Sequence, residues 1–201
     1  GTEYDPNYHG KLLYHTWETF VVRCCVMAYD AIAPVLAGPC PELEQFTGQT
    51  SGQIRHLIAE QLLRAMAAYI VDETGHIYGN YGMHQEGLLM IAAALRDTPG
   101  KPSSEEMVEW ILDNEEYGIY VYMPLYDALY NLVGRDGCAT ESPKYNNIWV
   151  RNLARMAPLL QLNGVDVTQL PRFKKLYEWE PRIVCAGEFT PALGDTGNIT
   201  H

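Results

Sequence analysis

Two short segments far apart in the chain carry side chains that could do chemistry, and each lies just before an apolar run. The first is residues 80–84, Asn-Tyr-Gly-Met-His, and the second is residues 136–145, Asp-Gly-Cys-Ala-Thr-Glu-Ser-Pro-Lys-Tyr. A helix needs apolar residues to pack, but it does not need an amide, an imidazole, a carboxylate and a phenol at its start. The two segments therefore predict one shared site that is suited to proton transfer beside an acidic group.

Tyr145 is placed for acid–base work in the second segment. Ser142 and Pro143 are typical of the N-cap and first position of a helix, which puts Tyr145 in the first turn. The positive end of the helix dipole stabilises a nearby negative charge by about 0.3–1 kcal/mol, and a phenol of pKa ~10 needs such help to act as a base. Trp149 shares this helix face, where an indole could stack on a sugar ring. The alternative is that both aromatic residues only pack.

Asn80 and His84 allow two interpretations from the first segment alone. Asn80 is the natural N-cap of a helix that begins near residues 81–82, and capping is the usual role of asparagine there. His84, one turn further on, is either a buried histidine or a chemical group of the site. Gly79 and Gly82 leave the backbone open to close approach by a ligand.

The order of apolar runs and helix breakers predicts an all-α fold. Thr50 and Ser103 each open a capping box, and Pro39 and Gly164 end helical runs. We expect one helical domain over residues 1–201, with a helical body over about 11–180 and a loop-rich tail at 181–201. The expected helices are residues 12–36, 50–70, 83–95, 103–112, 117–133 with a kink or break at Pro124, 142–162, and a short one within 170–177.

Two kinds of helix alternate by composition. Residues 83–95 are apolar almost all round, whereas residues 103–114 carry a charged face. An array of helical hairpins with an inner and an outer ring requires this alternation, because an inner helix is covered on every side.

Composition excludes several classes of protein. A formal net charge of -11 on 201 residues is unfavourable for binding nucleic acid. No apolar stretch reaches the roughly 20 residues that span a bilayer, and no signal segment is recognisable at the start. The five cysteines lack CxxC spacing, so a zinc site is not expected and a disulfide framework is not implied. No cofactor is expected either.

The two segments together resemble the helical toroid domain of the heparinase II/III superfamily, which includes alginate and oligoalginate lyases. In that family a Gly-Asn-aromatic element begins an inner helix, as residues 79–81 do here. A later Asp-Gly element followed by Glu-Ser-x-x-Tyr carries the catalytic tyrosine, as residues 136–145 do. Residues 194–197 are similar to a turn near the exit from the toroid. The resemblance covers about residues 12–197 and implies helical hairpins that form part of an incomplete (α/α) toroid.

The resemblance implies cleavage of uronic-acid polysaccharide by β-elimination, in a periplasmic or secreted protein. Asn80 matches the asparagine that neutralises the substrate carboxylate, and Tyr145 matches the tyrosine that acts as acid and in some members also as base. His84 would assist, although its spacing departs from an adjacent Asn-His pair. The expected substrate contacts are Trp149, Glu141 and Tyr81.

Two departures from the family pattern leave alternatives open. The family places another histidine in a following β-rich domain, so this chain is expected to be a fragment with little activity alone. The acidic charge also disfavours a polyanionic substrate, unless local cations offset it: Lys144, Arg151, Arg155, Arg172, Lys174 and Lys175. One alternative is a carbohydrate-binding or scaffolding module that lacks the chemistry. Another is a glycoside hydrolase, which needs two carboxylates about 5–10 Å apart from among Glu86, Glu115, Glu116 and Glu141.

Overall fold

The computed structural model describes residues 8–9, 12–13, 18–72, 80–114 and 120–194, and it confirms the all-α prediction. A two-residue hairpin, β1 (Tyr8–His9) with β2 (Leu12–Leu13), precedes the helices. The α-helices are α1 (Glu18–Ile32), α2 (Pro41–Thr47), α3 (Ser51–His56), α4 (Arg64–Asp72), α5 (Met83–Ala94), α6 (Ser104–Leu112), α7 (Leu125–Asn131), α8 (Pro143–Leu162) and α9 (Pro171–Ile183). Short 3-10 turns are η1 (Val35–Ala37), η3 (Tyr120–Tyr122) and η4 (Val167–Gln169), and η2 (Leu57–Leu63) is a π-helix.

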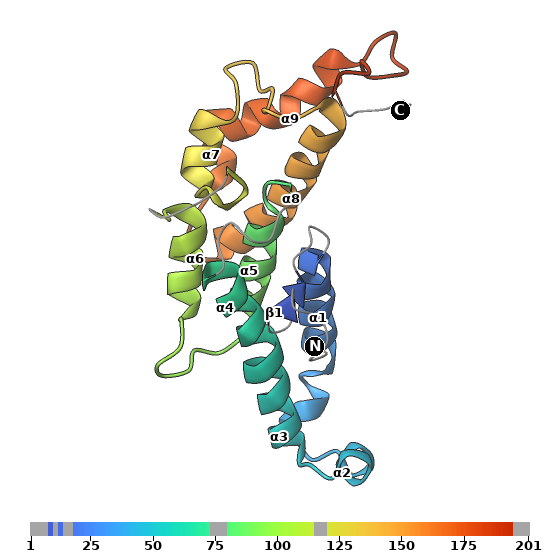
Figure 1. Ribbon diagram of the computed structural model, residues 1–201, viewed down its shortest axis with the longest axis vertical. Helices are drawn as coiled ribbons and strands as arrows, with labels where there is room; N and C mark the ends of the chain where they lie inside the picture. The colour runs from blue at the N-terminus through green and yellow to red at the C-terminus, as the bar shows by residue number, and fades with distance from the viewer. Residues whose placement is uncertain (1–7, 10–11, 14–17, 73–79, 115–119, 195–201) are drawn as a thin grey trace.

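The helix α5 lies at the centre of the molecule and packs against α1, α4, α6 and α8 (Figure 1). Its residues are covered on nearly all sides, and Leu88, Leu89 and Ile91 have no exposed surface. The composition of residues 83–95 predicted this, because an all-round apolar helix has no face that favours water. By contrast, α6 buries only Met107, Val108 and Ile111 and turns its charged residues outward.

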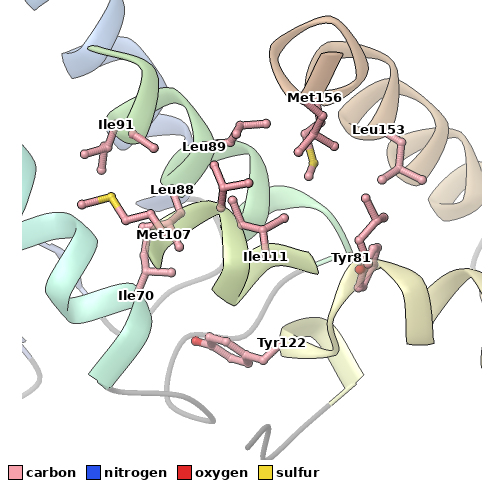
Figure 2. Packing of buried hydrophobic residues seen from close by; sticks show 14 of the residues in the cluster. Ile70, Tyr81, Leu88, Leu89, Ile91, Met107, Ile111, Tyr122, Leu153 and Met156 are labelled. Atoms are coloured by element: carbon pink, nitrogen blue, oxygen red, sulfur yellow. The ribbon is translucent and has the colours of Figure 1, made fainter. Parts of the chain in front are cut away.

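The hydrophobic core forms around α5, with side chains converging from α4, α6, η3 and α8. Figure 2 shows Ile70 and Met107 beside Leu88, while Leu153 and Met156 of α8 approach from the opposite side. This packing joins helices that are far apart in sequence, so it fixes how the start of α5 sits relative to the start of α8.

The predicted helix through residues 50–70 is present as one continuous run of α3, η2 and α4. Thr50 and Gln53 form the expected capping box, in which each side chain accepts from the other residue's backbone N–H. The π-helical turn in the middle of this run was not predicted, since sequence periodicity does not distinguish a π-helix from an α-helix.

Arg64 fixes the loop that follows α5. Its guanidinium is almost fully buried, donates to Glu60 Oε2 at 2.9 Å, and donates to the carbonyls of Arg96 at 2.9 Å and Pro102 at 3.0 Å. Thr98 Oγ1 in turn donates to Glu60 Oε1 at 3.1 Å. One buried cation therefore holds the loop from residue 96 to residue 102 against the π-helical turn.

Some predicted boundaries are wrong, whereas the predicted break at Pro124 is confirmed. Leu12 and Leu13 pair with β1, because their extended backbone fills the ladder of a short hairpin. Pro124 separates η3 from α7, as expected for a residue that cannot donate to a helical hydrogen bond. The last helix, α9, extends to Ile183 through Pro181, since its buried stripe of Phe173, Leu176 and Trp179 continues to pack.

Some predictions lie outside the described residues. These concern Gly79, Glu115, Glu116, the predicted helix at residues 117–119 and the turn at residues 195–197. All five cysteines are described and free.

Candidate functional site

The two polar segments meet where α5 and α8 begin. Asn80 Nδ2 donates a hydrogen bond to Glu141 Oε2 at 2.9 Å, and these two residues are 61 positions apart. Trp149 Nε1, on the next turns of α8, donates to Glu141 Oε1 at 3.2 Å. Each oxygen of the Glu141 carboxylate thus accepts one hydrogen bond, from Asn80 or from Trp149. These two bonds join the segment before α5 to α8.

Asn80 is not the side-chain cap of α5, so that interpretation is wrong. Gly82 occupies the N-cap position with φ 89° and no side-chain cap, while the Asn80 carbonyl accepts from the Met83 N–H at 3.3 Å. Asn80 is 8% exposed as a residue, and its side-chain amide is directed to Glu141. A cap would need an acceptor that receives backbone N–H groups, whereas this amide donates to a carboxylate.

Gly82 is required by the packing of α8 on the start of α5. Asn152 of α8 donates from Nδ2 to the Tyr81 carbonyl at 3.1 Å. A Cβ on residue 82 would lie 2.8 Å from the Asn152 Cβ, and the positive φ itself disfavours any L side chain. The close approach of the two helices at this point therefore depends on glycine.

Tyr81 and Trp149 support the site from beneath rather than facing solvent. Both side chains have no exposed surface, and their ring centroids are 4.5 Å apart. The Tyr81 hydroxyl donates to the Met123 carbonyl at 3.0 Å. Burial, followed by the charge of Asp127, raises the pKa of Tyr81 well above its usual value. The two rings have no exposed surface through which to make the predicted sugar contacts. Trp149 instead donates to Glu141, and Tyr81 packs against the Trp149 ring.

His84 lies inside the core. Its side chain has no exposed surface, and its ring centroid is 4.5 Å from that of Tyr122. The next residue, Gln85, is also buried and donates from Nε2 to the Val121 carbonyl at 2.8 Å. Gln85 therefore holds η3 against α5, and His84 packs on the same 3-10 turn inside the core.

Tyr145 occupies the first turn of α8, as predicted, and its side chain is half-buried. Ser142 is at the N-cap position with Pro143 after it, but its hydroxyl makes no capping hydrogen bond. Asn146 Oδ1 instead accepts from the Ala139 N–H at 3.2 Å and fixes the segment before the helix. Asn146 Nδ2 and Ser142 Oγ are buried and have no hydrogen-bond partner within the part of the chain that the structure describes.

Sequence reasoning missed Asn146 and Asn152. Both lie inside α8 and are almost fully buried, at 0% and 3% exposure. Two buried asparagines on the apolar side of one helix are a recognisable signal, because an amide is costly to bury without a backbone partner. Their partners, the Ala139 N–H and the Tyr81 carbonyl, belong to the two segments that form the site.

The two described carboxylates considered for a hydrolase have separate surroundings. Glu141 accepts from Asn80 and Trp149, whereas Glu86 lies between Arg23 and Arg155, each 3.5 Å away. This arrangement does not favour the paired acid and base of a glycoside hydrolase.

No protein-family model, curated protein or solved structure matches this chain. Within the described segments, no three His, Cys, Asp or Glu side chains gather as a metal site requires. No helix in those segments combines the length and apolar character needed to cross a membrane.

Proposed function

We propose that this chain carries the helical part of a polysaccharide lyase, which cleaves uronic-acid-containing polysaccharide by β-elimination. The observation that supports this most is the hydrogen bond between Asn80 and Glu141 at the shared start of α5 and α8. The two motifs on which the heparinase II/III resemblance rests are in direct contact at this point. Packing of two unrelated helix starts would not require an amide to meet a carboxylate there.

The proposed chemistry requires a donor for the substrate carboxylate. Elimination removes a weakly acidic proton from the carbon next to that carboxylate, and the resulting enolate-like charge must be stabilised. An asparagine amide has two N–H donors, of which Glu141 engages one. The second would donate to the substrate, and Glu141 fixes the orientation of the amide before substrate binds.

Proton transfer is assigned to Tyr145. Its half-buried side chain projects from the first turn of α8, where the helix dipole stabilises a phenolate. As a phenolate, Tyr145 takes the proton from the carbon next to the carboxylate. The C–O bond to the leaving sugar then breaks as the double bond forms, and Tyr145 returns the proton to the departing oxygen. Nearby buried donors, Asn146 Nδ2 and Ser142 Oγ, add hydrogen-bonding capacity on the same turn.

A carbohydrate-binding module without chemistry is the second candidate. It is favoured by the complete burial of His84, which keeps that imidazole out of contact with a bound polymer. Such a module would bind the polymer and release it unchanged.

The test is an ultraviolet assay for the unsaturated uronate, performed with this chain and with the protein of its complete reading frame. Alginate, polygalacturonate and chondroitin sulfate serve as substrates, and dextran serves as the uncharged control. Elimination from at least one acidic polymer supports the lyase. If the protein binds one of these polymers and neither protein forms an unsaturated product, the lyase proposal is rejected in favour of the binding module.

A further inference from the structure

We propose that one face of α8 and the adjoining end of α1 form a cationic binding surface, which holds an acidic polysaccharide alongside the site at Asn80 and Tyr145. The inference rests on the proposed function, because it takes the same polymer as ligand. It goes beyond that function by naming the residues that bind the polymer away from the scissile bond.

The composition of α8 differs from that of the rest of the chain. The whole protein has a formal net charge of -11, yet this 20-residue helix contains Lys144, Arg151 and Arg155 and no acidic residue. A local excess of one sign in a chain of the opposite sign concentrates the field at that surface. A polyanion would otherwise be repelled by this protein.

The three cations share one face of α8. Their spacing of seven and then four residues returns to the same side of a 3.6-residue helix, and all three side chains are exposed. From Lys144 to Arg155 the helix rises by about 17 Å at ~1.5 Å per residue. The row begins on the first turn of α8, the same turn that carries Tyr145, the proposed proton-transfer group.

A buried carboxylate fixes the far end of this row. Glu86 of α5 is 4% exposed, and its two oxygens each lie 3.5 Å from an arginine nitrogen, one in Arg155 and the other in Arg23 of α1. The Arg23 guanidinium also lies 5.0 Å from the centroid of the Phe20 ring. Two cations around one anion leave an excess of one positive charge. Both arginine side chains remain partly in solvent, with 24% of Arg23 and 45% of Arg155 exposed.

This cluster is continuous with the candidate site. Arg23, Glu86 and Asn152 line one small cleft between α1, α5 and α8. Asn152 also donates to the carbonyl of Tyr81, the residue after Asn80. The cationic surface, defined as Arg23, Lys144, Arg151 and Arg155, thus adjoins this cleft through Arg23 and Arg155.

The test compares two triple variants that remove equal charge. In the first, Lys144→Gln, Arg151→Gln and Arg155→Gln neutralise the row on α8. In the second, Arg55→Gln, Arg96→Gln and Lys101→Gln neutralise exposed cations near the other end of α5. Dissociation constants for alginate and chondroitin sulfate are measured at low and high salt with the full chain, and dextran is the uncharged control.

We expect the first variant to bind the acidic polymers about tenfold more weakly at low salt, the combined effect of three exposed charge contacts. The second should change by less than about twofold, and the difference should shrink at high salt because exposed charges are screened. The double variant Lys144→Gln and Arg151→Gln leaves the Glu86 cluster intact and should still weaken binding by about threefold to fivefold. Circular dichroism establishes that each variant is folded.

Equal losses in the two triple variants, binding of dextran as tight as that of alginate, or no binding of either acidic polymer by the parent would overturn the proposal. The outcomes also separate it from the lyase. If no unsaturated product forms but the first variant alone loses binding, elimination fails and the surface stands. If product forms and the first variant binds as the parent does, the surface fails and elimination stands.

Discussion

The amide of Asn80 and the carboxylate of Glu141 are joined by a 2.9 Å hydrogen bond across 61 residues of chain. Neither residue belongs to a regular helix, since one precedes α5 and the other precedes α8. The bond therefore couples two helix starts that no local rule places together. Trp149 Nε1 donates to the second oxygen of the same carboxylate, which fixes the orientation of Glu141 toward Asn80.

A double-mutant cycle on Asn80→Ala and Glu141→Ala should show a coupling free energy of about 1–2 kcal/mol in unfolding, the range for a hydrogen bond to a charged group that is partly buried. The matched control is Asn147 with Glu180, an amide–carboxylate pair at 2.8 Å between α8 and α9. Both cycles should report coupling in stability. Only Asn80→Ala should also raise the reaction barrier, by about 3–4 kcal/mol; equal turnover in Asn80→Ala and Asn147→Ala would contradict its role.

Tyr145→Phe should lower turnover by roughly 10²-fold or more while the thermal midpoint stays near that of the parent, because only one oxygen is removed. Tyr126→Phe, on an exposed tyrosine of α7, is the control and should leave turnover unchanged. Turnover is followed by the ultraviolet signal of the product. Parental turnover in Tyr145→Phe would exclude this residue as the proton donor.

Gly82→Ala should destabilise the fold by about 2–4 kcal/mol. The estimate combines the left-handed backbone, ~1–2 kcal/mol, with the displacement of packed atoms. The new Cβ would meet the Asn152 Cβ at 2.8 Å. Gly100→Ala is matched in backbone, with φ 76°, but has nothing within 4 Å of its Cβ. Denaturant unfolding should therefore show a clearly smaller loss for Gly100→Ala, and similar losses would mean that the contact with α8 is unimportant.

Arg64→Met should cost about 3–5 kcal/mol, because it leaves the Glu60 carboxylate and two backbone carbonyls without their buried donor. Hydrogen exchange should show faster exchange of amides at residues 96–102 than in the parent. Arg182→Met is the control, since that arginine pairs with Glu178 on the surface. It should change stability by no more than about 1 kcal/mol.

The capping box of α6 should contribute to acid sensitivity. The backbone N–H of Ser103 donates to Glu106, and together with the Ser103 side chain it lowers the pKa of that carboxyl from 4.5. A carboxyl whose pKa is lower in the folded state stabilises the fold above its unfolded pKa, and the contribution is lost as pH falls through the folded pKa. Glu106→Gln keeps an acceptor but does not titrate. Its unfolding free energy should therefore fall less than that of the parent between pH 5 and pH 3.

The sequence by itself determined the local features of this protein. The capping boxes at Thr50 and Ser103, the break at Pro124 and the start of α8 at Pro143 follow from hydrogen bonding and sterics within a few residues. The burial of α5 also followed, because a helix that is apolar all round has no side suited to water. The same local rules left a cap and a chemical role both open for Asn80, since they do not show that Glu141, 61 residues away, accepts from its amide.

Only the tertiary structure decided which side chains face one another and which remain in reach of solvent. Tyr81, His84 and Trp149 have residue types that suit a site, yet the contacts of α5 with α8 and η3 enclose all three. In the sequence, Glu86 is an isolated acidic residue in an apolar helix. In the structure, Arg23 of α1 and Arg155 of α8 both lie next to its carboxylate. Periodicity gives the face on which a residue lies, whereas the partner of that face depends on how separate helices pack, and that information is not local.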